Sequence, residues 1–152
     1  MTTPTLPATS HTPQKYVGPS AAEVLAQRKQ FLNPAIFLYY KEPLMLVEGK
    51  MQYVWDDTGK RYLDGLGGIV TVSVGHCHPH VVAAAAKQND TLQHSTTIYL
   101  HPNICTYAEK LASKMPGALK VCYFANSGSE ANDLALLMAR AFTGNYDVIA
   151  LR

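Results

Sequence analysis

Apolar and polar positions along the chain first predict a capped helix that is followed by a β-meander. Ser20 and Glu23 have the spacing of a capping box, and apolar residues follow until Asn33-Pro34, where the residue before proline disfavours helical backbone. Beyond this break, short apolar runs are separated by a turn at 57–60, where Gly59 suits a tight reversal. These runs predict strands at 45–47, 51–55 and 61–63.

The second half of the chain has the helical period. Its apolar spacing predicts helices over about 79–92, 102–114 and 130–142, with Gly144 as the C-cap of the last helix. Apolar runs at 119–125 and 147–151 predict a strand on each side of that helix. Because strand, helix and strand in this order predict a parallel βαβ unit, the sheet is unfinished after its second strand. This pattern favours the interpretation that the 152 residues are a fragment.

Composition excludes several classes of protein. Hydrophobic residues make up 47% of the chain and charged residues 16%, so the chain is too apolar to be disordered throughout. The net charge of +2 comes without a basic stripe and gives no support for nucleic-acid binding, and the apolar runs are too short to span a membrane. Three widely spaced cysteines favour reduced thiols and an intracellular compartment over a disulfide scaffold.

Residues 1–19 are rich in Thr, Pro and Ser and predict a disordered tail. No acidic residue precedes Glu23, which is compatible with an organelle transit peptide, whereas the first arginine is Arg28 and transit peptides are rich in arginine. Both interpretations stay open at this point. The pattern then places a helix-and-meander segment at 20–75 and an α/β segment at 76–152.

The most informative motif is Asn126-Ser127-Gly128-Ser129-Glu130, which lies between a predicted strand and a predicted helix. Backbone N–H groups and the helix dipole at such a position favour an anion, and a phosphate group would suit them. The alternative is structural, because Ser127 and Glu130 also have the spacing of a capping box, which needs no ligand. The motif lacks the lysine of a P-loop and the glycine pattern of a dinucleotide site.

Other candidate residues favour structural roles. The cluster of His76, Cys77, His78 and His80 lacks zinc-site spacing, so we predict no metal site and expect a tight turn with His78 as N-cap. The glycines at 65–68, followed by Ile69, are compatible with either a ligand cleft or a flexible turn. No nucleophile is placed beside His94 or His101, and the sequence has no Ser/His/Asp hydrolase signature.

Taken in serial order, several stretches resemble the class III pyridoxal-phosphate aminotransferases. They are Gln52-Tyr53-Val54-Trp55-Asp56, Gly59, Tyr62-Leu63-Asp64-Gly65, Gly75-His76-Cys77-His78-Pro79 and Asn126-Ser127-Gly128-Ser129-Glu130-Ala131-Asn132. Gly-Pro-Ser-Ala-Ala-Glu at 18–23 and Met-Pro-Gly at 115–117 are most similar to the alanine–glyoxylate aminotransferase 2 branch. The resemblance covers the chain from about Tyr16 to Arg152, and the order of the motifs makes it specific.

The resemblance implies a fold and a set of roles. The fold is α/β, of the type I PLP-transferase (aspartate aminotransferase-like) kind, with residues 76–152 forming the start of its large cofactor-binding domain. Ser127, Gly128 and Ser129 would hold the phosphate of pyridoxal 5'-phosphate, chiefly through backbone N–H groups. Ile69 would line the substrate pocket, while Asp64 and the turn at 75–79 would be structural.

The activity that the resemblance implies is transfer of an amino group, from an amino acid such as alanine to a keto acid such as glyoxylate. In the family, the lysine that forms the Schiff base lies far downstream of the Ser-Gly-Ser turn, and no lysine of this chain matches it. No catalytic residue is therefore assigned, and we expect the 152 residues to be inactive alone. The family works as a homodimer, and it suggests a mitochondrial location.

Two alternatives to an aminotransferase segment stay open. The first is a non-catalytic, truncated product that associates with full-length subunits of the same family. The second, outside the family, is a small phosphate-binding α/β module, which the open sheet disfavours because it leaves unpaired edges and apolar faces. For the same reason we expect the isolated chain to be poorly soluble.

Overall fold

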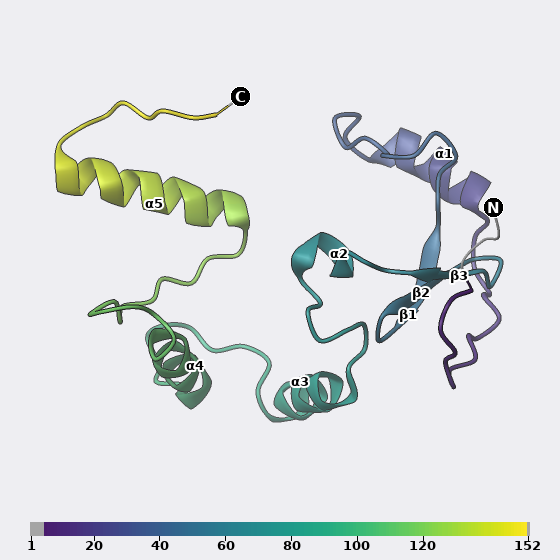
Figure 1. Ribbon diagram of the computed structural model, residues 1–152, viewed down its shortest axis with the longest axis horizontal. Coiled ribbons are helices and arrows are strands. Elements are labelled where there is room, and N and C mark those ends of the chain that lie inside the picture. Colours follow the sequence, from purple (N-terminus) through teal and green to yellow (C-terminus); the bar gives the residue numbers. More distant parts are fainter. Residues whose placement is uncertain (1–4, 152) are drawn as a thin grey trace. The chain divides into compact units, whose positions relative to one another are not determined.

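The computed structural model describes residues 5–151, which form five helices and a three-stranded sheet (Figure 1). In chain order the elements are α1 (Ala21–Phe31), β1 (Leu46–Lys50), β2 (Tyr53–Asp56), β3 (Arg61–Leu63), α2 (Gly67–Val70), α3 (Pro79–Thr91), α4 (Pro102–Ala112) and α5 (Gly128–Thr143). Contacts divide the chain into one unit that ends at Gln93 and a second that begins at His94.

Helix α1 begins and ends where the sequence predicts. The Ser20 N–H donates to Glu23 Oε2 at 2.7 Å, and the Glu23 N–H donates to Ser20 Oγ at 3.3 Å, so both halves of the capping box form. Leu32 is the C-cap, directly before Asn33-Pro34. The hydrogen bonds from Ser20 hold the pKa of the Glu23 carboxyl below its ordinary range.

The three strands form an antiparallel meander in the order β1-β2-β3. Lys50 pairs with Tyr53, so the hairpin between β1 and β2 closes over only Met51 and Gln52. Met51 has the left-handed φ of 52°. Because these two residues form the turn, β2 begins at Tyr53 and not at residue 51, whereas the predicted strand 61–63 is confirmed as β3. In the second turn, Gly59 has a φ of +85°.

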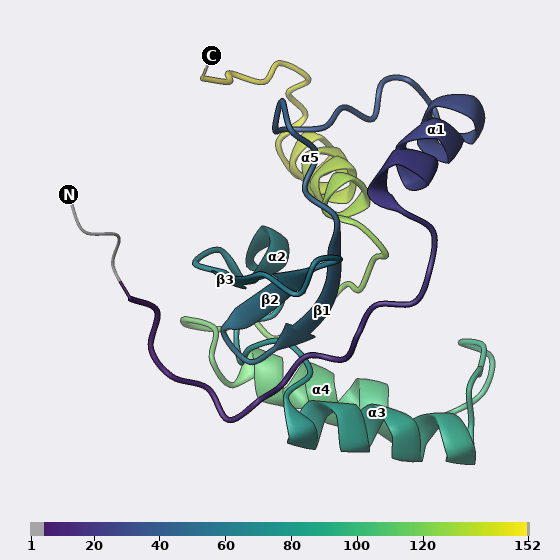
Figure 2. The ribbon, with the colours of Figure 1, turned by 90° about the vertical axis from the view of Figure 1, so that its right-hand side faces the viewer.

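The buried core of the described residues consists of β2. Tyr53, Val54, Trp55 and Asp56 are its buried residues, and the neighbouring strands are the elements that pack closely together. The N-terminal segment runs beside this meander (Figure 2). There the Tyr53 hydroxyl donates to the carbonyl of Pro7 at 2.8 Å. Part of the segment predicted as a tail therefore contacts β2, and its predicted limits stay predictions.

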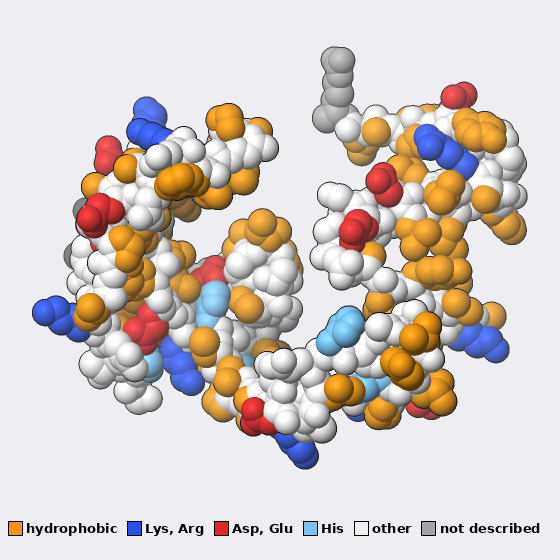
Figure 3. Space-filling view, turned by 180° about the vertical axis from the view of Figure 1, so that it is seen from behind, with side chains coloured by type: hydrophobic (Ala, Val, Ile, Leu, Met, Phe, Trp, Pro, Cys, Tyr) orange, Lys and Arg blue, Asp and Glu red, His pale blue; other side chains and the backbone are white. Residues whose placement is uncertain are grey.

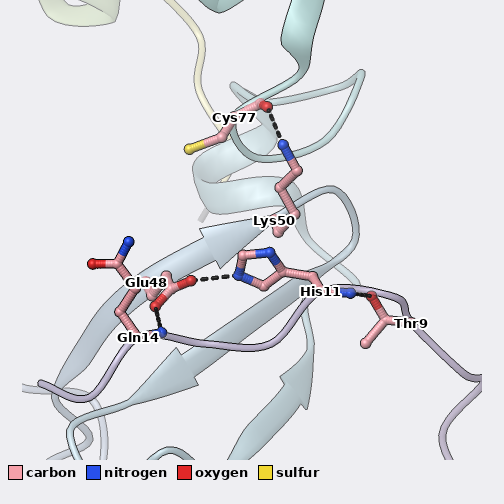
Figure 4. A network of polar contacts seen from close by, with 6 residues as sticks. All are labelled: Thr9, His11, Gln14, Glu48, Lys50 and Cys77. Atoms are coloured by element: carbon pink, nitrogen blue, oxygen red, sulfur yellow. Dashed lines mark hydrogen bonds and ion pairs between the residues drawn. The ribbon is translucent and has the colours of Figure 1, made fainter.

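A second contact of the N-terminal segment lies on β1 and β2 (Figure 4). His11 Nε2 meets Glu48 Oε1, and the backbone N–H of Gln14 donates to Glu48 Oε2 at 2.9 Å. The His11 ring also lies against Trp55, with 5.0 Å between ring centroids. The hydrogen bond from His11, and to a smaller extent the one from Gln14, holds the pKa of Glu48 below its ordinary range.

The unit that begins at His94 is helical, and its predicted strands do not form. Among the described residues, 119–125 and 147–151 pair with no strand, so the predicted parallel βαβ unit is corrected to helix and extended chain. An apolar run of residues that favour strands sets the local preference, but a strand also needs a neighbour for its backbone groups. Helix α5 ends as predicted at Gly144, whose φ is +71° and whose N–H donates to the Arg140 carbonyl at 2.9 Å.

Hydrophobic side chains are widely exposed in both units. Figure 3 shows them spread over the visible surface, and Ile69, Phe142 and Ile149 are among those exposed by more than four-fifths. Such an extent of exposed apolar surface is unusual for a chain that folds and stays monomeric. Among the helices of the described residues, none has the length and apolar character needed to cross a bilayer.

Candidate functional site

The turn Ser127-Gly128-Ser129 forms the start of α5. Ser127 is the N-cap with extended backbone, and its Oγ accepts from the Glu130 N–H at 3.1 Å. The Glu130 carboxylate turns back to the N–H of Asn126, at 2.7 Å. The predicted capping box is thus half formed, because the carboxylate reaches the residue before the N-cap and not the N-cap itself.

This geometry leaves two backbone donors open. The N–H groups of Gly128 and Ser129 have no acceptor within the helix, and no side chain of the described residues accepts from them. A Cβ at Gly128 would meet nothing within 4 Å, so the space beside this residue is open. With the dipole of a 16-residue helix behind them, these donors fit the phosphate group of a cofactor.

The second predicted site residue, Ile69, lies in a tight turn of the unit that ends at Gln93. Its backbone (φ −94°, ψ 67°) breaks the short α2, between Gly68 and Val70, which both have positive φ. The side chain is 87% exposed. Ile69 and the Ser127–Ser129 turn belong to different units, and a role for Ile69 toward a substrate stays a prediction.

The structure brings Asp64 and His76 together, a pair that the sequence did not indicate. The Asp64 carboxylate accepts from His76 Nε2 at 2.7 Å and from the backbone N–H groups of Leu66, Gly67 and Gly68 at 2.9–3.0 Å. The hydrogen bond from His76 and then those from the backbone hold the pKa of Asp64 well below its ordinary range. An Asp followed by a glycine-rich run is a signal for such a side-chain-to-backbone turn.

A pocket of about 360 Å³ lies beside this pair. It is lined by residues 51–52, 64–67 and 72–76, and Ile69 is not among them. One wall is a two-way backbone bridge between Met51 and His76, whose N–H groups each donate to the other's carbonyl at 2.7 Å. The pocket is therefore framed by the β1–β2 hairpin turn and by the segment that carries Asp64.

Asp56 is the second carboxylate with several partners, and it organises the turn between β2 and β3. Its oxygens accept from the Thr58 and Lys60 N–H groups, from Thr58 Oγ1 at 2.6 Å, and from the Tyr62 hydroxyl at 2.7 Å. Burial acts to raise the pKa of Asp56, but these hydrogen bonds outweigh it and lower the pKa to about 2. The hydrogen bond between Tyr62 and Asp56 also raises the pKa of the Tyr62 hydroxyl.

We expect Asp56 to make the stability of the meander depend on pH. Its folded pKa of about 2 lies below the ordinary value of 3.8, so the unfolded chain takes up the proton first as the pH falls. The stabilisation is complete above about pH 4 and is lost progressively toward pH 2. Urea unfolding followed by the fluorescence of Trp55, the single tryptophan, measures it. Asp56→Asn should flatten this acid dependence, and an unchanged slope would contradict the role of the carboxylate.

The histidine and cysteine cluster near residue 77 is a turn into α3. Pro79 begins the helix after the N-cap His78, as predicted. Within the part of the chain that the structure describes, no three His, Cys, Asp or Glu side chains are gathered around a common point. The three cysteines are free thiols; Cys77 and Cys105 are exposed and Cys122 is half-buried.

Comparison with known families places the chain among aminotransferases by sequence. The family model described as aminotransferase class-III matches residues 39–151. The alanine–glyoxylate aminotransferase 2 homolog 2, mitochondrial, of Arabidopsis thaliana is 52% identical over 147 residues, which are 97% of this chain and 31% of the relative. The human alanine–glyoxylate aminotransferase 2, mitochondrial, is 48% identical over 151 residues, which are 99% of this chain and 29% of the relative.

The chain is also similar in structure to solved enzymes, among them a transaminase. A phospholyase from Arthrobacter in complex with phosphoethanolamine is 43% identical, with a TM-score of 0.74 over 81% of this chain and 28% of that chain. An (S)-enantioselective omega-transaminase from Thermomicrobium roseum is 34% identical, with a TM-score of 0.70 over 84% of this chain and 30% of that chain. The chain thus spans less than a third of the length of each of these relatives.

Proposed function

Because the chain belongs to the class-III aminotransferases, we propose that it supplies the phosphate-binding turn of a transaminase that uses pyridoxal 5'-phosphate. The open N–H groups of Gly128 and Ser129 at the start of α5 are the observation that carries this proposal. When bound, the cofactor acts as an electron sink for the bonds at the amino-acid α-carbon. The chain's part is to hold and orient the phosphate end.

The fit of the turn to a phosphate rests on donors and not on cations. The segment from Asn126 to Glu130 has no Lys or Arg, so the backbone N–H groups and the helix dipole meet the charge. The Glu130 carboxylate is engaged by the Asn126 N–H, on the side of the turn that precedes the N-cap. The Ser129 hydroxyl lies beside the two open donors in sequence and adds a further donor for a phosphate oxygen.

The proposed reaction is transfer of an amino group from alanine to glyoxylate. Its support is the identity of 48–52% to relatives named as alanine–glyoxylate aminotransferases over nearly the whole chain. An apolar Ile69 at the substrate side suits a small amino or keto acid. We further propose a mitochondrial location, since the same relatives are named mitochondrial, and action as a homodimer.

A chimera tests the proposed reaction. This chain replaces the matching 147 residues of the Arabidopsis thaliana relative, and pyruvate formation from alanine and glyoxylate is measured with added cofactor. We expect the chimera to keep at least about a tenth of the parent's kcat/KM, because each transferred residue should support the same transition state. The parent enzyme is the positive control, and a folded chimera without activity would contradict the proposal.

The alternative, a non-catalytic chain that associates with larger subunits, is favoured by the exposed apolar side chains of both units. Co-expression of this chain with the full-length Arabidopsis relative tests the alternative, which expects the two to associate and the activity of the full-length enzyme to fall. Finding neither association nor loss of activity would contradict it.

A further inference from the structure

The Asp64 carboxylate connects the turn at 66–68 with His76, which lies twelve residues after Asp64. Its Oδ1 accepts from the N–H groups of Leu66 and Gly67, and its Oδ2 accepts from Gly68 N–H and from His76 Nε2. A carboxylate offers about four acceptor positions, so all of them are used. One side chain therefore sets both the direction of the glycine-rich turn and its distance from His76.

The turn that Asp64 holds has unusual backbone conformations. Gly67, Gly68 and Val70 have positive φ, and Ile69 lies between Gly68 and Val70. Directly after α2, the Thr71 and Val72 N–H groups both donate to the Gly67 carbonyl at 3.0 Å. Neither of these two bonds involves Gly68 or Ile69. Backbone in such conformations persists where neighbouring groups determine it, and here the Gly68–Asp64 bond is the neighbour.

The other end of the connection is anchored on the β1–β2 hairpin. The N–H of Asp64 donates to the Gln52 carbonyl at 2.9 Å, and His76 is bridged to Met51 through two backbone bonds of 2.7 Å. Met51 and Gln52 are the turn residues of this hairpin. Both partners of the Asp64–His76 pair are thus tied to neighbouring residues of the same rigid turn.

We propose that Asp64 and His76 are positioning residues that hold Gly68 and Ile69 in place relative to the β1–β2 hairpin, and thereby set the substrate side of the site. The part about substrate rests on the proposed function, while the part about the turn does not. The pair touches no reacting atom in this assignment and acts through the backbone of the turn. Its effect should therefore fall on substrate affinity and on local order.

The variant Asp64→Asn tests the bonds of Oδ2, to Gly68 and His76, separately from those of Oδ1, to Leu66 and Gly67. With Oδ1 kept toward Leu66 and Gly67, the new NH₂ group faces Gly68 N–H, and His76 has to accept through Nε2 in its other tautomer. We expect amide exchange at Gly68, followed by NMR in this chain, to become about tenfold faster, while exchange at Leu66 and Gly67 changes by less than about threefold. The ring ¹⁵N shifts of His76 should report the change of tautomer.

Asp56→Asn is the matched control, because the Asp56 carboxylate also accepts four hydrogen bonds but holds the turn between β2 and β3. It should leave exchange at Gly68 and the His76 ring shifts unchanged. Unchanged exchange at Gly68 in Asp64→Asn, or an equal increase throughout β1 and β2, would overturn the proposal. The equal increase would assign Asp64 to general stability. If Asp64→Asn does not fold, His76→Ala, which keeps the backbone bridge to Met51, is measured in its place by amide exchange at Gly68 alone, with the same overturning results.

The Arabidopsis chimera tests the part of the proposal about substrate, because KM and kcat for alanine can be measured in it. There Asp64→Asn should raise KM for alanine about fivefold or more and change kcat by less than about twofold, because the positioned turn binds substrate and does no chemistry. An unchanged KM would overturn the substrate part of the proposal. An inactive unmodified chimera would overturn the proposed function alone, and the Gly68 exchange measured in this chain would still decide the positioning role.

Discussion

Replacing Ser129 with aspartate is expected to weaken the binding of pyridoxal 5'-phosphate at least about tenfold, since two like charges about 4 Å apart repel by about 1 kcal/mol in water and more near a protein surface. Ser129 is the second residue of α5, next to the two open N–H donors. At this position a carboxylate interacts favourably with the helix dipole. The variant should therefore keep or increase helicity while it repels a phosphate.

The measurement is a titration of the chain with pyridoxal phosphate and, separately, with inorganic phosphate, together with circular dichroism. Asn103→Asp is the matched control, because it puts the same charge at the second residue of α4 in the same unit. It should leave both affinities unchanged. Equal affinities in Ser129→Asp and the parent chain would show that the start of α5 is not the phosphate site.

Gly75→Ala should cause a large loss of stability, because Gly75 lies against the Met51 turn of the β1–β2 hairpin. Gly75 has a φ of +96°, and a Cβ there would lie 2.8 Å from the Cα and 2.9 Å from the carbonyl carbon of Met51. Relieving that clash moves backbone and breaks the bridge between Met51 and His76. We expect a loss of about 3 kcal/mol or more, as for other substitutions that combine backbone strain with overpacking.

Gly59→Ala is the comparison for this experiment. Gly59 also has a positive φ, of +85°, but a Cβ there would meet nothing within 4 Å. Gly59→Ala should lower the free energy of unfolding by only about 1 kcal/mol, the cost of a left-handed backbone conformation for alanine. Urea unfolding followed by Trp55 fluorescence measures both variants. Equal losses would mean that the approach of Met51 to Gly75 contributes nothing.

Local features of the fold were predictable because their causes lie within a few residues. The capping box at Ser20 and Glu23, the helix start at Pro79 and the C-cap at Gly144 each depend on a side chain or backbone group acting on its near neighbours. The same holds for the Ser127 cap at the start of α5. Interactions of such short range can be predicted directly from the order of the residues.

Features that depend on a distant partner were missed or wrong. The strands predicted at 119–125 and 147–151 do not form among the described residues, because an apolar run that favours strands sets a local preference but supplies no ladder partner. The contact of His11 with Glu48 joins positions 37 residues apart, and nothing in the local sequence around either residue predicts the other as its partner. The short α2 was missed for a different reason, because its glycines permit many conformations and favour none.

The amino-acid sequence by itself determined the family, the capped helices, the meander and the turn at Ser127–Ser129 that begins α5. These follow from residue order, because caps, tight turns and helical periods act over at most a few residues. Only the tertiary structure decided that Asp64 and His76 meet, and that Met51 approaches Gly75 closely enough to exclude a side chain. Such contacts depend on how the hairpin returns in space, which no local spacing specifies.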